Sequence, residues 1–211
     1  MKVAIIDYGM GNLGSVRRAL EQLGAEAEIV DTPEQLEDAD RIILPGVGSF
    51  ADGMRHLNRD GWTEALIRLT GEGKPLLGIC LGMQLLASEG SEHGDHPGLG
   101  LVPGRVVHLD TMDCKERIPH VGWNDIHVNQ PEGNPSAVLF DGIQDGTDFY
   151  FVHSFAYQAE QASDVLAQVQ YGIPVTAAVG RGHVMGTQFH PEKSSRAGFR
   201  ILKNFLEFEA C

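Results

Sequence analysis

The chain has 211 residues, of which 42% are hydrophobic and 21% are charged, and its formal net charge is -13 at pH 7. This length and balance are typical of one globular domain with a sizeable core. The acidic excess repels phosphate backbones, which argues against a nucleic-acid partner. The sequence has no apolar run of about 18 residues and no leader pattern before its first predicted strand, so we expect no membrane partner.

Three cysteines, Cys80, Cys114 and Cys211, are too few and too irregularly spaced for a disulfide framework. Unpaired cysteines are typical of a reducing compartment, so the sequence predicts a cytoplasmic protein. Only Cys80 lies within a motif. Cys114 and Cys211 lie in no recognisable motif, and we expect neither to have a functional role.

The first half of the chain alternates short apolar runs with amphipathic segments. Strands separated by helices predict a parallel sheet with helices on both faces. The pattern predicts strands at residues 3–6, 27–30, 41–44 and 75–79, and helices at 15–23, 32–40, from 50 to about 70, and from about 83.

The second half has more alternating, strand-like runs and ends in an amphipathic helix from about residue 196. The whole pattern predicts one domain over residues 1–211 of the α/β class. We expect a flavodoxin-like, doubly wound, mostly parallel sheet with an antiparallel extension in the C-terminal half. The later strands are predicted at residues 149–155, 165–171, 175–179 and 183–189, with a hairpin tip at 180–182.

Residues 74–88, KPLLGICLGMQLLAS, predict a strand, a sharp turn and a helix, with Cys80 at the turn. Glycines on both sides of a nucleophile permit a strained strand-to-helix elbow. A helix N-terminus favours a thiolate, and the N–H of Leu81 is a natural oxyanion donor. The alternative is a buried structural cysteine, since free cysteines are often small core residues.

The loop from Gly9 to Gly14 contains a literal GxGxxG, and Asp31 follows 17 residues later. This spacing raises the possibility of a nucleotide-binding module. Asp7 and Tyr8 argue against it, because they separate the strand from the first glycine and place a carboxylate near a pyrophosphate. A glycine-rich loop without a ligand, or one that meets a partner, fits the sequence better.

Two further loops follow predicted strands or helices. The Gly46-Val47-Gly48 run allows close backbone approach and offers N–H donors, although an ordinary turn has the same composition. Residues 88–100 contain His93, Asp95 and His96. A solvated loop is the better interpretation of that segment, because the three side chains lack further metal ligands at suitable spacing.

A second polar cluster follows the last predicted strand. His190 and Glu192 are two residues apart in what the sequence predicts to be an extended segment, so both face the same way. A carboxylate that orients an imidazole, together with a cysteine at an elbow, is the pattern of nucleophilic catalysis. The chain order is cysteine, histidine, glutamate, which differs from that of the α/β-hydrolases.

With these motifs, GICLGMQLL and QFHPEKSS, the chain resembles the class I glutamine amidotransferases. DYGMGN, LPGVGSF, PHVGWN and HPEKSS are similar to the imidazole glycerol phosphate synthase branch of that family. The motifs extend from residue 7 to 195, which is nearly the whole chain.

The resemblance implies a catalytic triad of Cys80, His190 and Glu192, which hydrolyses glutamine through a γ-glutamyl thioester. It implies no cofactor and no metal, L-glutamine as substrate, and a separate (β/α)8 cyclase subunit as recipient of the ammonia. Phe155 stands where family members often carry tyrosine. The remaining implied residues are Val47 and Leu81 for the oxyanion, Gly48, Gln84, Ser154 and Phe155 for the substrate, and Asn12, His120, Trp123 and Lys193 for the partner-facing side.

Other functions stay open from the sequence. The chain has the residues expected of the glutaminase of another synthase, or of a γ-glutamyl hydrolase. A nucleotide-binding module through the loop from Gly9 to Gly14 is an alternative of another class. A catalytically silent subunit of the same fold is a third, although the intact set of Cys80, His190 and Glu192 argues against it.

Overall fold

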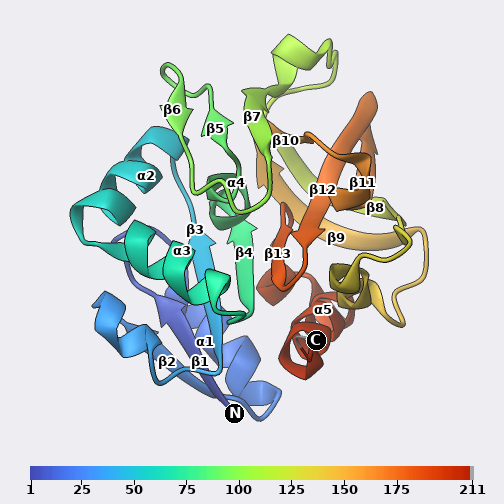
Figure 1. The fold of residues 1–211 in the computed structure, drawn as a ribbon. Helices are drawn as coiled ribbons and strands as arrows, with labels where there is room; N and C mark the ends of the chain where they lie inside the picture. Colours follow the sequence, from blue (N-terminus) through green and yellow to red (C-terminus); the bar gives the residue numbers. More distant parts are fainter. Residues whose placement is uncertain (210–211) are drawn as a thin grey trace.

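The computed structural model describes residues 1–209, and within them the strands form two sheets (Figure 1). The larger sheet has the order β2-β1-β3-β4-β13-β12-β11-β8-β9, and the smaller has the order β10-β7-β5-β6. The strands are β1 (Lys2–Ile6), β2 (Glu26–Val30), β3 (Arg41–Gly46), β4 (Leu76–Cys80), β5 (Glu89–Gly90), β6 (His96–Pro97), β7 (Gly104–His108), β8 (His120–Val128), β9 (Thr147–His153), β10 (Phe155–Ala159), β11 (Val165–Tyr171), β12 (Ile173–Arg181) and β13 (Val184–Thr187).

Strands β2, β1, β3 and β4 are parallel, which confirms the predicted doubly wound half. β1, β3 and β4 are nearly continuous apolar runs because both faces of the sheet are covered there, whereas the edge strand β2 carries exposed Glu26 and Glu28. Successive residues of β1 contribute to opposite cores: Val3 and Ile5 pack with one cluster, Ala4 and Ile6 with the other. The two-residue period of a strand thus divides one short run between two helical layers.

Helices cover both faces of the parallel half (Figure 1). The cluster around Val3 includes the apolar faces of α1 and α5, and the cluster around Ala4 includes those of α2, α3 and α4. The helices are α1 (Leu13–Gln22), α2 (Phe50–Arg59), α3 (Trp62–Gly71), α4 (Leu81–Leu85) and α5 (Ser195–Glu207).

The C-terminal half extends the sheet with antiparallel strands, as predicted. β13 connects the two halves, because it pairs with β4 in parallel and with β12 in antiparallel register. β11, β8 and β9 continue the antiparallel part.

Three local predictions were wrong. The segment after Thr32 forms only a 3-10 turn (Pro33–Leu36), in which Oε1 of Gln35 accepts the N–H of Thr32 at 3.0 Å. The helix after the elbow begins at Leu81, earlier than predicted, and has five residues, so its dipole is small. Part of the predicted loop 88–100 forms β5 and β6, which pair with each other.

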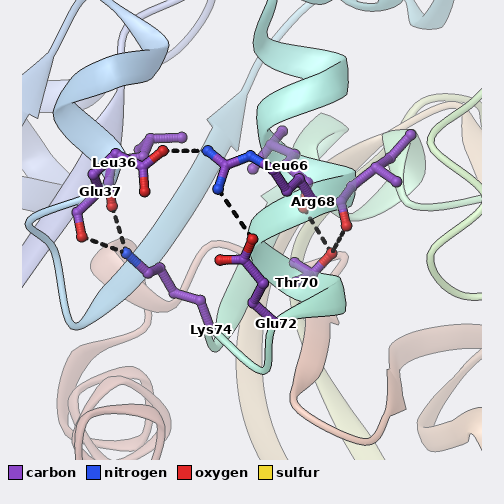
Figure 2. Close-up of polar contacts among 8 residues, drawn as sticks. Leu36, Glu37, Leu66, Arg68, Thr70, Glu72 and Lys74 are labelled. Atoms are coloured by element: carbon purple, nitrogen blue, oxygen red, sulfur yellow. Dashed lines mark hydrogen bonds and ion pairs between the residues drawn. The ribbon is translucent and has the colours of Figure 1, made fainter.

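Polar contacts fix the approach to the elbow strand (Figure 2). Nζ of Lys74 donates to the carbonyl oxygens of Leu36 at 2.6 Å and Glu37 at 2.8 Å. On α3, Arg68 pairs with Glu37 and, at 3.1 Å, with Glu72. These contacts connect the start of β4 to the 3-10 turn and to α3, so the strand that carries the elbow is anchored at its beginning.

The carboxyl ends of β3 and β4 lie beside each other. Gly46 is the register partner of Cys80, and α4 starts directly after Cys80. The smaller sheet and α4 lie at this end of the parallel strands (Figure 1). Ligands of doubly wound folds bind at this edge of the sheet, so the topology predicts a ligand site around Cys80.

Candidate active site

Cys80 lies at the sharp turn between β4 and α4. Its φ of 55° and ψ of -108° fall outside the regions that residues with a Cβ normally adopt. Such a backbone costs about 1–3 kcal/mol, which its surroundings must offset. Glycine neighbours permit the turn: a Cβ on Gly82 would lie 1.8 Å from the carbonyl oxygen of Leu44, and one on Gly78 would lie 2.6 Å from that of Gly82.

The sulfur of Cys80 is nearly enclosed, since the residue is 7% exposed. Its Sγ lies 3.9 Å from the carbonyl oxygen of Val152 and 3.7 Å from Nε2 of Gln188. Gln188 is fully buried, and its Oε1 accepts a hydrogen bond of 2.9 Å from Nε2 of Gln84. Gln84 therefore orients the Gln188 amide so that an N–H faces the sulfur of Cys80.

His190 and Glu192 meet across a short 3-10 turn, Pro191–Lys193. Nδ1 of His190 lies 2.8 Å from Oε1 of Glu192, and the two side chains are 3% and 1% exposed. The sequence predicted an extended segment here, which was wrong, because the N–H of Lys193 bonds to the carbonyl of His190 at 3.0 Å and closes the turn. A tight turn brings the two side chains together as effectively as a strand does.

The second ring nitrogen of His190 is the one available for proton transfer. Nε2 is buried and has no hydrogen-bond partner among residues 1–209, while His190 lines the same cavity as Cys80. Burial lowers the pKa of His190, but contacts with Cys80 and Glu192 outweigh burial and raise the pKa to about 9. The ring of His190 is therefore protonated at neutral pH.

Two backbone segments that could supply N–H donors line the space in front of Cys80. Leu81 is the first residue of α4, so its N–H has no acceptor within the helix. Because Gly46 lies opposite Cys80, the next residues, Val47 and Gly48, come beside the nucleophile and line its cavity. The N–H groups of Leu81 and Val47 remain the predicted oxyanion donors.

A cavity of about 280 Å³ opens in front of Cys80. Small-ligand pockets measure roughly 300–1,000 Å³, so this cavity suits a ligand the size of one amino acid. The predicted substrate residues Gly48, Gln84, Ser154 and Phe155 all line it. Gln84 also contacts another residue that lines the cavity, since its Nε2 donates to the carbonyl oxygen of Phe155 at 3.2 Å.

Sequence reasoning missed Glu92, which lines the cavity. Oε2 of Glu92 accepts a hydrogen bond of 2.7 Å from the N–H of Phe50, the first residue of α2. The sequence shows an acidic residue in a glycine-rich segment, but only the tertiary structure shows that it lines the cavity, where the N–H of Phe50 holds its carboxylate. A carboxylate in this position favours a ligand with a cationic group.

Two more polar side chains near Cys80 were not predicted. Gln188 directly follows β13 and precedes Phe189 and His190. A polar residue at the end of a largely apolar run was the only sign in the sequence that Gln188 could belong to the site. The hydroxyl of Tyr8 is buried without a hydrogen-bond partner in residues 1–209, and a Cβ on Gly46 would lie 2.4 Å from it. Burial raises the pKa of Tyr8 well above its ordinary value, so the phenol stays neutral.

The four predicted partner-facing residues do not share one environment. Asn12 and Lys193 are exposed, and Trp123 is 51% exposed. His120 is fully buried, so its predicted place on the partner-facing surface is corrected. Alternate residues of β8 face opposite ways, and His120 pairs with His153 on the inner side.

Other sequence features lie apart from this site. Within residues 1–209, no group of histidine, cysteine, aspartate or glutamate side chains could hold a metal ion, and no helix is long and apolar enough to cross a membrane. In the loop that follows β1, the N–H of Gly9 is bonded to the carboxylate of Asp7 at 3.0 Å. Cys114 is a buried free thiol, and Cys211 lies outside the described residues.

Comparison with known proteins agrees with this geometry. The profile of the family "Glutamine amidotransferase class-I" matches residues 4–208. The imidazole glycerol phosphate synthase subunit HisH of Desulfitobacterium hafniense (strain DSM 10664 / DCB-2) is 50% identical over 204 residues, which cover 96% of this chain and 92% of that protein. The protein of the same name from Syntrophotalea carbinolica is 47% identical over 207 residues, covering 96% of this chain and 98% of that protein.

Solved structures share the fold at lower identity. A crystal structure of a glutamine amidotransferase superposes with a TM-score of 0.75 at 24% identity, covering 98% of this chain and 97% of that one. The PurLQS structure from Thermotoga maritima gives a TM-score of 0.77 at 21% identity and 98% coverage of both chains. By the profile match and by these relatives, the chain belongs to the class I glutamine amidotransferase family.

Proposed function

We propose that this chain is the glutaminase subunit of an imidazole glycerol phosphate synthase. It hydrolyses L-glutamine to L-glutamate and ammonia, and the ammonia passes to a cyclase subunit in histidine biosynthesis. The observation that carries the proposal is the cavity in which Cys80 faces the buried pair of His190 and Glu192. The extent of identity to proteins named as that subunit supports the assignment of the synthase.

The reaction begins when the thiolate of Cys80 attacks the side-chain carboxamide carbon of glutamine. As the S–C bond forms, the π electrons of the carbonyl move to its oxygen. The N–H groups of Leu81 and Val47 are the donors that we assign to this oxyanion, and one such donor is worth roughly 10²–10³ in rate. His190 gives its Nε2 proton to the leaving nitrogen, the C–N bond breaks, and ammonia departs from the γ-glutamyl thioester.

Hydrolysis of the thioester uses the same groups in reverse. The neutral His190 takes a proton from water at Nε2, and the resulting hydroxide attacks the thioester carbon. The second oxyanion forms in the same place as the first. When the carbonyl re-forms, the C–S bond breaks, Cys80 leaves as the thiolate, and glutamate is released. Glu192 holds Nδ1 throughout, so the ring stays oriented with Nε2 toward the sulfur.

Substrate recognition follows from the charges that line the cavity. The carboxylate of Glu92 is the group that we assign to the α-ammonium of glutamine. The backbone around Gly48, Ser154 and Phe155 is assigned to the remaining polar atoms of the substrate, with Gln84 fixing the position of Phe155. This arrangement distinguishes an α-amino acid amide from a simple carboxamide.

The partner is a (β/α)8 cyclase subunit, which together with this chain forms a heterodimer in the cytoplasm. Exposed apolar side chains gather at and beside the cavity: Val47 is 46% exposed, Val121 55%, Trp123 51% and Val152 37%. Val121 lies opposite Val152, and Trp123 lies opposite Tyr150, so these side chains share the outer face of β8 and β9. We call Val47, Val121, Trp123 and Val152 the docking face, since exposed apolar groups of this kind mark interaction sites.

A direct test measures glutamate release from glutamine by the purified chain, alone and with a cyclase subunit and its nucleotide substrate. We expect turnover that the partner stimulates, and none from Cys80→Ala in either mixture. Cys114→Ala is the matched control, because Cys114 is also a buried free thiol but lies outside the cavity. Hydrolysis by Cys80→Ala equal to that of the unmodified chain contradicts the assignment.

A second measurement tests the partner. Trp123→Ala should weaken binding to the cyclase subunit, while Ile67→Ala on α3, a residue of similar exposure at 47%, should not. Hydrolysis that the cyclase leaves unchanged would instead indicate the glutaminase of another synthase or a γ-glutamyl hydrolase.

A further inference from the structure

Residues 152–155, which we call the corner segment, join the two sheets and form one wall of the cavity. β9 ends at His153 in the larger sheet, and β10 begins at Phe155 in the smaller one, so only Ser154 separates them. All four residues of the segment line the cavity in front of Cys80. The position of this corner therefore sets one side of the substrate site.

The side chain of His153 spans the corner. Its Nδ1 donates to the carbonyl oxygen of Phe155 at 2.8 Å, and Nε2 of Gln84 donates to the same oxygen at 3.2 Å. The N–H of Leu109 donates to the carbonyl oxygen of Ser154 at 2.9 Å. Donors from three separate elements thus fix two consecutive peptide planes of the cavity wall.

His120 supports His153 from the neighbouring strand. Its Nδ1 lies 3.0 Å from Nε2 of His153, and its Nε2 lies 3.0 Å from Oδ1 of Asn124. The ring of His120 is fully buried and is stacked between Tyr171, at 3.9 Å between centroids, and Phe151, at 4.9 Å. The ring can neither tilt nor move away without losing both stacking contacts.

These contacts define where each proton lies. The Nδ1 of His153 must carry a proton, because it faces a carbonyl oxygen. Burial lowers the pKa of His153 to about 3, so the ring is neutral and its Nε2 offers a lone pair. Two lone pairs cannot face each other at 3.0 Å, so Nδ1 of His120 must be the protonated nitrogen of its ring. Burial lowers the pKa of His120, so the ring is neutral and its Nε2 accepts, which requires the carboxamide of Asn124 to turn Nδ2 toward it in place of Oδ1. His120 therefore selects the tautomer of His153 that donates to Phe155.

We propose that His120 and His153 are positioning residues for the substrate: His120 fixes the tautomer of His153, and His153 holds the Phe155 carbonyl and with it the corner segment. This role rests on the proposed glutaminase function. β8 carries His120 on its inner side and Val121 and Trp123 of the docking face on its outer side. The same strand therefore carries two residues of the docking face and the histidine that supports the substrate wall.

Paired amide replacements separate this role from a merely structural one. His153→Asn keeps an N–H donor near the position of Nδ1, whereas His153→Gln keeps an N–H donor near the position of Nε2. We expect His153→Asn to retain the KM for glutamine within about twofold. We expect His153→Gln to raise the KM about tenfold, the equivalent of one hydrogen bond, with kcat much less affected.

A double-mutant comparison tests the contribution of His120. His120→Gln removes the donor to His153 and should raise the KM in the unmodified chain. In the His153→Asn background it should have little further effect, because an asparagine amide has no tautomer to select. The rate at which iodoacetamide alkylates Cys80 should be the same in all four proteins, which shows that the elbow is intact.

Equal KM values for His153→Asn and His153→Gln would overturn the inference, as would an undiminished effect of His120→Gln in the His153→Asn background. Failure of the proposed function has a different signature. In that case the unmodified chain, with and without the cyclase subunit, would release no glutamate although Cys80 is alkylated normally.

Discussion

Nδ1 of His190 lies 2.8 Å from Oε1 of Glu192, and the two side chains are almost completely withdrawn from solvent. This contact assigns one ring nitrogen to the carboxylate and leaves the buried Nε2 for Cys80 and the substrate. It also makes the protonated ring favourable in a place where burial alone would make it unfavourable. We therefore expect the alkaline limit of the proposed reaction to be set by the pair rather than by His190 alone.

Glu192→Gln is expected to move that limit. The pKa of His190 lies near 9, above its ordinary value of 6.5, so the protonated ring is present at neutral pH and is lost as the pH rises through 9. Removing the carboxylate charge lowers this pKa, and the descending limb of kcat/KM should shift to lower pH. The measurement is the pH profile of glutamate release. An unchanged descending limb would show that Glu192 does not control the ring.

Glu92→Gln should raise the KM for glutamine by about 10-fold or more, because a charge-assisted hydrogen bond to the α-ammonium is lost. The matched control is a substrate: the glutamine analogue that lacks the α-amino group. The KM for this analogue should be high in the unmodified chain, and Glu92→Gln should hardly change it. Equal effects on both substrates would show that Glu92 acts on the fold of the cavity and not on the ammonium group.

Gly82→Ala should abolish activity and destabilise the fold by several kcal/mol, since the new Cβ would lie 1.8 Å from the carbonyl oxygen of Leu44. Gly71→Ala, at the end of α3, meets no atom within 4 Å and should change stability by less than about 1 kcal/mol. Thermal and denaturant unfolding measure both changes. A stable and active Gly82→Ala protein would contradict the close approach of β3 to the elbow.

Arg181→Met should reduce stability while leaving glutamine hydrolysis unchanged. Asp164 has a 6% exposed side chain, and Arg181 bonds to it with Nε at 3.1 Å and Nη2 at 2.5 Å. Loss of the cation leaves a buried carboxylate unpaired. Because the arginine is itself 45% exposed and water can replace part of it, we expect a loss of about 1–3 kcal/mol. Arg105→Met, whose acidic partners are both exposed, should cost less than about 1 kcal/mol.

The elbow shows why part of this site was visible in the sequence. The glycines around Cys80 are local requirements of a strained turn, and they stand within two residues of the nucleophile. His190 and Glu192 are equally close to one another along the chain. Even the incorrect expectation of an extended segment did not alter their pairing, because two residues separated by one proline meet in a 3-10 turn as well.

Gln188, Glu92 and His120 show what the sequence left undetermined. The amide of Gln188 faces a sulfur 108 residues away, and Glu92 lines the cavity with its carboxylate held by the N–H of Phe50. His120 lies in a motif that resembles a partner-binding segment, yet its register opposite His153 turns it inward. Each of these directions depends on contacts between distant segments of the chain, which no local pattern encodes.

The sequence by itself determined the alternation of strands and helices in the first half, the doubly wound sheet and the elbow, and it singled out Cys80, His190 and Glu192 as the proposed nucleophile, base and orienting acid. These follow from hydrophobic period and from backbone restrictions, which act over a few neighbouring residues. Only the tertiary structure decided which side chains close the cavity, which residues of β8 face solvent, and how two histidines hold the corner segment. Those outcomes are set by register and burial, which arise when segments far apart in the chain pack together.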